Sequence, residues 1–210
     1  QQMKIYESSK TTLKPYLIEK PLMVFVGSSV NAVRKSSGKD VSDVVDVLLF
    51  IDEFIKSKTE SIANIEKILS FDSGLQTTKG VDIFENKFGF LENTKLNASQ
   101  LFDDILNIIF NASSGILHLE NLKGVDGEIA LKIGENEHFG VINVGDSQSL
   151  VKICEANGIT VSSRDFSSSL FKTINDTNSN LNILIGSKKF SEGWSSWRVS
   201  TMGLMNIGKK

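Results

Sequence analysis

The sequence has few of the residues that build disulfides and metal centres. Its 210 residues include one cysteine, Cys154, and two histidines, His118 and His138. A single cysteine excludes an intrachain disulfide and a zinc site made of cysteines. Two histidines that stand apart in the sequence argue against a histidine cage for a metal ion. We therefore expect this chain to hold no metal.

Long apolar runs and an excess of positive charge are also missing. No run approaches the roughly 18 apolar residues of a membrane-spanning helix, and the polar residues 1–4 do not resemble a signal peptide. We therefore expect no membrane partner and a cytoplasmic location. The formal net charge of −2 gives no overall basic field for nucleic acid, although a local basic patch can still form.

What is present indicates a folded domain. Hydrophobic residues make up 40% and charged residues 23% of the chain, a composition too apolar for a disordered protein. The length suits one large domain, or one domain that carries an insertion. Because the chain begins at Gln1 and stops at 206–210, directly after an apolar segment, we expect it to be a piece of a longer protein.

Short apolar runs alternate with helical patterns over much of the chain. Buried strands are predicted over residues 22–26, 139–144, 159–161 and 181–185, and helices over 41–55, 57–69, 147–157 and 167–175. Strands and helices that alternate at this spacing are typical of an α/β fold with a doubly wound parallel sheet.

The middle of the chain has a different pattern. A further helix is predicted over 100–110, and two alternating segments, 115–119 and 128–133, flank a glycine-rich turn and predict a β-hairpin. We therefore assign residues 1–39 and 139–210 to the sheet domain, and residues 40–138 to an inserted lobe of helices and a β-hairpin.

Small and polar residues come after three of the predicted strands. They are Gly27, Ser28 and Ser29 after the first, Gly145 and Asp146 after the second, and Gly186, Ser187, Lys188 and Lys189 after the last. In an open parallel sheet, ligands bind beyond the carboxyl ends of the strands. Exposed amides and hydroxyls at such ends suit phosphate oxygens, although a Gly-Ser pair after a strand is also common in loops that bind nothing.

Both tryptophans of the chain lie close together after the last of these strands. Trp194 and Trp197 accompany Glu192 and Arg198 within the segment 190–198. A globular loop seldom concentrates tryptophan in this way. Either ring can be a core anchor, and we expect the two rings to divide between anchoring the loop and a functional role.

Residues 184–200 closely resemble motif V of superfamily-2 helicase-like motors, in the version found in the restriction (Res) subunit of type III restriction-modification enzymes. Ser187 falls on the Thr or Ser position of the motif, and Glu192 and Gly193 fall on its Glu-Gly pair. Ser195 stands where the motif usually has Asp, which weakens the inferred ribose contact.

Segments nearer the start of the chain agree with this resemblance. Residues 20–31 resemble motif IV, the first strand of the second RecA-like domain, and residues 42–48 are similar to the segment after motif IV in the type III family. Arg164 with Phe171 resembles the Arg…Phe helix that precedes motif V. The fold that the resemblance implies is a RecA-like doubly wound parallel sheet with an inserted α+β lobe.

The function that the resemblance implies is that of a fragment of an ATP-dependent DNA translocase or helicase. Such a fragment contributes half of the ATP cleft and part of the DNA track. The implied ATP-binding residues are Glu192, Gly193, Trp194 and Ser195. The implied DNA-binding residues are Gly27, Ser28, Ser29, Gly145, Asp146, Gly186, Ser187, Lys188 and Lys189.

The implied partners are DNA, the modification (methyltransferase) subunit, and a first RecA-like domain and a nuclease domain of the same longer protein. No Gly-x-x-x-x-Gly-Lys-Ser/Thr phosphate loop, Asp-Glu-Ala-Asp box or motif VI arginine pair occurs in the sequence. ATP and Mg²⁺ would therefore be held mainly by the first RecA-like domain, and the fragment alone would have no catalytic residue and no activity.

An alternative is a stand-alone α/β module that binds a ligand or a protein partner without catalysis. A small enzyme that uses the same strand ends would need a nucleophile and a base. Ser29, Ser187 and Ser195 have no convincing histidine partner, because both histidines fall near the predicted hairpin.

Overall fold

The fold is known from a computed structural model, which describes residues 1–27, 34–36, 38–165, 167–187 and 194–205. Within these residues the strands are β1 (Leu22–Gly27), β2 (Arg34–Ser36), β3 (Lys39–Val41), β4 (Leu117–Leu122), β5 (Glu128–Ile133), β6 (Gly140–Asn143), β7 (Thr160–Arg164), β8 (Ile183–Ser187) and β9 (Val199–Leu204). The helices are α1 (Gln2–Leu13), the short 3-10 turn η1 (Lys14–Tyr16), α2 (Asp43–Lys56), α3 (Lys58–Leu69), α4 (Gly89–Thr94), α5 (Ala98–Ile109) and α6 (Ser147–Ala156).

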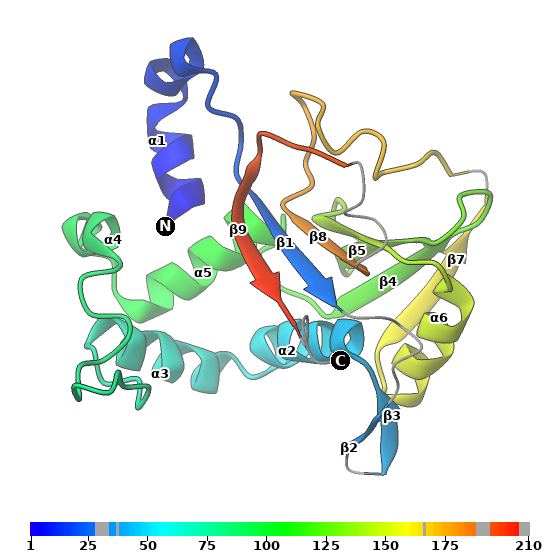
Figure 1. Cartoon of the computed structure of the whole chain (residues 1–210), viewed down its shortest axis with the longest axis horizontal. Coiled ribbons are helices and arrows are strands. Elements are labelled where there is room, and N and C mark those ends of the chain that lie inside the picture. The colour runs from blue at the N-terminus through cyan, green and yellow to red at the C-terminus, as the bar shows by residue number, and fades with distance from the viewer. Residues whose placement is uncertain (28–33, 37, 166, 188–193, 206–210) are drawn as a thin grey trace.

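Seven of the described strands form one central sheet in the order β7-β4-β5-β6-β8-β1-β9 (Figure 1). β5 runs antiparallel to β4 and β6, and the remaining neighbours are parallel. β2 and β3 form a separate two-stranded hairpin. The chain is therefore an α/β protein with a mostly parallel central sheet flanked by helices. This confirms the fold class that the sequence pattern predicts.

The predicted β-hairpin is formed by β4 and β5, but it lies in the middle of the central sheet and not in a lobe beside it. The reason is that β5 is buried along its whole length and pairs with β6 along its second edge. The turn before β5 depends on Gly127, since its φ is +76° and an added Cβ would lie 2.0 Å from the carbonyl oxygen of Val144.

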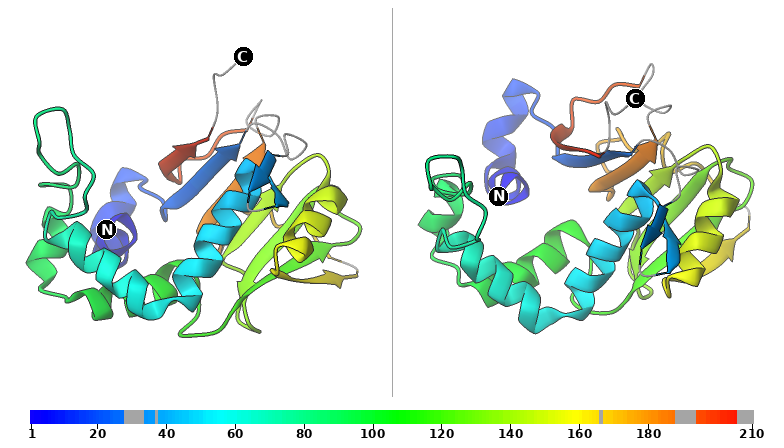
Figure 2. Two further views of the ribbon diagram at one scale, coloured as in Figure 1. Left: turned by 90° about the horizontal axis from the view of Figure 1, so that it is seen from below. Right: turned by 60° about the horizontal axis from the view of Figure 1, so that its bottom comes forward.

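The first face of the sheet carries the larger core. Helices α2, α5 and α6 pack there against alternate strand residues such as Leu119, Ile129, Ile142 and Ile185. Figure 2 shows that α3 and α4 extend beyond the sheet on the side of α1, which lies beside α5. The expected lobe 40–138 is thus divided, because α3 and α4 project while α2, β4 and β5 belong to the sheet and its cover.

The second face of the sheet has a smaller core and no long helix among the described residues. Leu22, Val24, Val141 and Leu184 pack there against Ile174 and the segment around it. The helix predicted over 167–175 is not formed, since residues 170–177 run through successive turns.

The carboxylate of Glu128 holds the start of this segment against the sheet. It accepts hydrogen bonds from the backbone amides of Leu170 and Phe171 and from the Ser169 hydroxyl. The segment is rich in Ser, Thr and Asn, and the local bonds of Ser169 to the Lys172 amide and of Thr173 to the Leu170 carbonyl oxygen favour turns over a helix. The Arg164…Phe171 part of the resemblance therefore has no helix in this structure.

Among the residues that the structure describes, none of the helices is both long and apolar enough to cross a lipid bilayer.

Candidate functional site

The carboxyl ends of β6, β8 and β1 lie side by side at one edge of the sheet. In the parallel ladders Gly27 is opposite Ser187, and Asn143 is opposite Gly186. Adjacent strands are about 4.8 Å apart. The structure therefore brings together the three strand ends that the sequence singles out, although they come from distant parts of the chain.

Some of the expected site residues lie outside the described part of the chain. They are Ser28, Ser29, Lys188, Lys189, Glu192 and Gly193. The described members are Gly27, Gly145, Asp146, Gly186, Ser187, Trp194 and Ser195.

Gly27 has a packing role at this edge. A Cβ added there would lie 3.0 Å from the Cβ of Asp43, the first residue of α2. The absence of a side chain at Gly27 thus lets the start of α2 approach the end of β1. This role accounts for the glycine without any ligand.

Asp146 is the N-cap of α6. Its carboxylate accepts hydrogen bonds from the Ser149 backbone amide at 3.0 Å and from the Ser149 hydroxyl at 2.6 Å. These bonds hold the pKa of the Asp146 carboxyl below its usual range. The carboxylate is therefore ionised at neutral pH, so it opposes a phosphate group at this helix N-terminus, contrary to the contact expected of Asp146.

A cavity of about 460 Å³ opens beside this N-cap. It lies between the β4–β5 turn and the first turn of α6, and its walls include Gly145, Asp146 and Gln148. An added Cβ at Gly145 would meet no atom within 4 Å, so its backbone is open to a ligand. At this strand end, the backbone of Gly145 and not the side chain after it is the group that suits a phosphate.

The two tryptophans have different environments. The ring of Trp194 lies 5.9 Å from the ring of Phe171, centroid to centroid, and packs on the smaller core. Trp197 is 95% exposed. Between them, the Ser195 carbonyl oxygen accepts a hydrogen bond from the Asn175 amide group. Trp194 is thus the anchoring ring, and Trp197 is free of the core.

Arg198 is buried, which the sequence pattern did not indicate. Its guanidinium donates to the backbone carbonyl oxygens of Lys20 at 2.9 Å, Leu181 at 2.5 Å and Ile174. Burial lowers the pKa of Arg198. One side chain therefore connects the segment before β1 and the segment before β8 to the residue that precedes β9. These hydrogen bonds hold the start of β9 in place.

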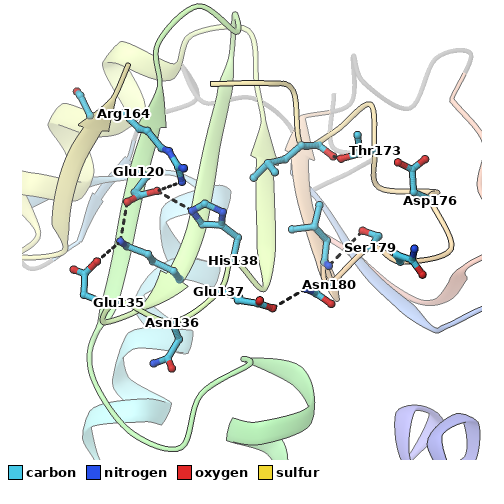
Figure 3. A pocket seen from close by; sticks show the side chains of 15 residues that line it. Glu120, Glu135, Asn136, Glu137, His138, Arg164, Thr173, Asp176, Ser179 and Asn180 are labelled. Carbon is cyan, nitrogen blue, oxygen red and sulfur yellow. Dashed lines mark hydrogen bonds and ion pairs between the residues drawn. The ribbon is translucent and has the colours of Figure 1, made fainter. Parts of the chain in front are cut away.

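A polar cavity on the second face of the sheet was not found from the sequence. It is lined by charged residues of β4, β5 and β7 and by the segment 170–181 (Figure 3). Glu120 lies on the sheet side of this cavity, where its carboxylate bonds Lys132 at 2.7 Å and His138 at 2.7 Å. Arg164 lies 3.7 Å from the same carboxylate. Charged residues at alternate positions of two mostly buried strands, Glu120 in β4 and Lys132 in β5, were the signal that could have revealed this group.

Glu120 and Lys132 are both charged. Burial alone would raise the pKa of Glu120, but hydrogen bonds from Lys132 and His138 outweigh it and lower the pKa to about 2. Burial alone would lower the pKa of Lys132, but hydrogen bonds to Glu120 and Glu135 outweigh it and raise the pKa. The cavity thus contains a permanent ion pair at neutral pH.

Each of the two histidines has a side-chain hydrogen-bond partner in the structure. His118 Nε2 lies 2.8 Å from the hydroxyl of Ser162 on the neighbouring strand, and His138 bonds Glu120. Within the described residues, no group of three or more His, Cys, Asp or Glu side chains is arranged to hold a metal ion.

Comparison with known proteins gave no relative. No protein-family model, no curated protein and no solved structure matches the chain.

Proposed function

We propose that this chain is the second RecA-like domain of an ATP-dependent DNA translocase of the type III restriction (Res) subunit family. The observation that carries the proposal is the pairing of β1 with β8. β1 lies within the segment that resembles motif IV, and β8 begins the segment that resembles motif V. The two strands are direct parallel neighbours whose ends meet at Gly27 and Ser187. The resemblance assigns DNA contact to residues at both strand ends, and their meeting at one edge of the sheet is what a single DNA track needs.

Backbone chemistry at this edge supports contact with DNA. Gly145 leaves the main chain open beside the end of β6, and two lysines, Lys188 and Lys189, come after β8 in the sequence. Amides and hydroxyls that bind phosphates do not read bases, which suits a motor that tracks along any sequence.

ATP and Mg²⁺ in this proposal are held mainly by a first RecA-like domain of the longer protein. The resemblance assigns Glu192, Gly193 and Ser195 to the nucleotide from this side, whereas the ring of Trp194, which it also assigns, packs on Phe171 and serves as the anchor. The purified chain should not hydrolyse ATP, because it lacks a phosphate loop and the acidic box that positions magnesium. The partners are DNA, the methyltransferase subunit and the nuclease domain, in the cytoplasm.

A second candidate is a stand-alone α/β module that binds a ligand without catalysis. The polar cavity around Glu120 favours this alternative, since its charged walls do not depend on another domain. The two candidates differ in whether the chain should bind DNA.

The test is DNA binding by the full 210-residue chain, measured by fluorescence anisotropy on two unrelated duplexes over a range of salt. We expect similar affinity for both duplexes. The double variant Lys188→Ala with Lys189→Ala should bind more weakly, with a log–log salt slope flatter by about one to two units, because each neutralised phosphate contributes about 0.9.

The charge-matched control is Lys79→Ala with Lys87→Ala, which removes two exposed lysines far from the strand ends. This control should behave as the parent chain does. If the chain does not bind DNA at low salt, or if both double variants lose the same affinity, the proposed DNA site is wrong.

A further inference from the structure

An apolar cavity of about 340 Å³ lies on the first face of the sheet, between α1, α2, α3 and α5. Its floor consists of Met23 and Phe25 of β1 and Ile183 of β8. Figure 2 shows that α1, α3 and α5 lie together on this side of the sheet. Met23 and Ile183 pair at the amino ends of their strands, so the apolar cavity is separate from the proposed DNA-binding edge at the carboxyl ends.

Large apolar side chains that the fold leaves only partly buried line this cavity. Helix α3 contributes Ile65 and Ile68, and α5 contributes Ile105 and Ile108, all of them half-buried. Phe50 of α2, which is 69% exposed, also lines the cavity. Apolar side chains from several elements that converge on one cavity without closing it are typical of a binding site. An apolar ligand would remove these side chains from water.

The polar side chains that line the apolar cavity already have partners. Among the described residues they are Gln1, Lys4 and Asp104. Lys4 and Asp104 form an ion pair with each other. The Gln1 side chain donates a hydrogen bond to the carbonyl oxygen of Lys87 and accepts one from the Phe90 amide, both at 3.2 Å. A charged ligand would therefore find no unpaired side chain of opposite charge, and a water molecule would lack the about two to four polar partners that it needs.

The volume of the cavity distinguishes a small molecule from a partner helix. Two turns of an α-helix, about 10 Å wide with side chains and about 11 Å long, occupy roughly 850 Å³. The cavity has about 340 Å³, which is less than half of that volume. A carbon atom with its hydrogens takes about as much space as a water molecule, roughly 30 Å³, so the cavity has room for about eleven carbon atoms.

We propose that this cavity binds a small, uncharged apolar molecule of up to about eleven carbon atoms. The binding does not depend on the proposed DNA-binding function, because it uses no residue of the DNA-binding edge.

The test uses the full 210-residue chain and the uncharged fluorescent probe 2-naphthol, which fits this volume and which hexanol, heptanol and octanol should displace. We expect saturable binding of the probe. The affinity for the alcohols should rise about fourfold with each added CH₂ group, since burying one CH₂ group contributes about 0.8 kcal/mol. Octanoate and octylammonium should displace the probe at least about tenfold more weakly than octanol, because their charge would leave water without gaining a partner.

Two variants that fill the cavity test its location. Ile68→Trp on α3 and Ile105→Trp on α5 should each weaken octanol binding at least about tenfold, since the larger ring occupies the space of the ligand. Ile116→Trp is the control, because Ile116 is 51% exposed and does not line the cavity, and it should bind octanol as the parent chain does. Circular dichroism checks that each variant is folded. If a variant does not fold, the series of alcohols decides the question on the parent chain alone.

Four results would overturn the proposal. The first three are no saturable binding of 2-naphthol, equal binding of octanol and its charged analogues, and cavity-filling variants that bind octanol as the control does. The fourth is a site that forms only in a dimer, detected by analytical ultracentrifugation over a range of concentrations. The apolar walls would then belong to an interface between two copies of the chain.

Discussion

Nε2 of His138 lies 2.7 Å from Oε2 of Glu120, and this contact fastens the loop before β6 to the middle of β4. Lys132 bonds the other carboxylate oxygen of Glu120. One carboxylate thus joins the central strands of the sheet to a loop. Protonation of Glu120 should therefore lower the free energy of unfolding.

The stabilisation from Glu120 should depend on pH in a defined window. The pKa of Glu120 in the folded chain is about 2, below its ordinary value of 4.5. A lowered folded pKa means that the stabilisation is present above pH 4.5 and is lost as the pH falls towards 2. Relative to Glu120→Gln, the parent should be more stable by about 1 to 2 kcal/mol at pH 7, a value reduced by solvent screening.

Urea unfolding of both proteins between pH 7 and pH 3 measures this difference. Glu85→Gln, which removes an exposed carboxylate outside the cavity, is the matched control and should show no such change. A gap between parent and Glu120→Gln that is equal at pH 7 and pH 3 would show that the carboxylate is not stabilised by its neighbours.

Removing one partner of the buried pair should cost more than removing both. Lys132→Met leaves the Glu120 carboxylate without its ammonium partner and should destabilise the fold by about 3 kcal/mol. In the double variant with Glu120→Leu the uncompensated charge is gone, so the loss should be smaller than for Lys132→Met alone. Denaturant unfolding of the two single variants and the double variant gives the coupling energy. Additive losses would mean that the two side chains act independently.

The two tryptophans should differ in how much each contributes to the free energy of unfolding. Trp194→Ala removes a ring that packs on Phe171 and the smaller core, and should cost about 2 to 3 kcal/mol, below the value for a fully buried ring. Trp197→Ala removes an exposed ring and should change the free energy of unfolding by less than about 0.5 kcal/mol. Thermal unfolding compares the two variants directly. Equal losses would contradict the assignment of Trp194 as the anchor.

Arg198 should not tolerate even a conservative change. Lysine keeps the charge but cannot reach the three carbonyl oxygens that the guanidinium bonds, so Arg198→Lys should cost at least about 3 kcal/mol. Arg164→Lys, at an exposed arginine, is the control for the same chemical change and should cost less than about 0.5 kcal/mol. If both variants unfold at the same temperature, the buried hydrogen bonds of Arg198 contribute nothing to the stability of the fold.

The local elements of the fold can be predicted from sequence periodicity. The apolar runs at 22–26 and 139–144 become β1 and β6, and the glycine-rich turn before residue 128 closes the predicted hairpin. These features depend on neighbouring residues, so a single sequence contains enough information to predict them.

Features that depend on distant contacts were not predictable in the same way. The pattern of β5 fits a strand in a lobe as well as one in the sheet, and only its pairing with β6 decides between them. The position of the segment 167–175 depends on its bonds to Glu128, about 40 residues before it in the chain. In the candidate site, glycine at strand ends was predictable, whereas the buried Arg198 and the Glu120 group depend on contacts that the sequence does not reveal.

The place of β1 between β8 and β9 has a consequence for the order of folding. Its two neighbours are the last strands of the sheet in sequence, while β4, β5 and β6 are joined by short connections. Contacts between distant residues form slowly, because long loops must close first. During synthesis the apolar residues 22–26 therefore have no sheet partner until residues 183–204 have left the ribosome. We expect the β4–β5–β6 meander to form first, and β1 to be the strand that most needs protection by chaperones.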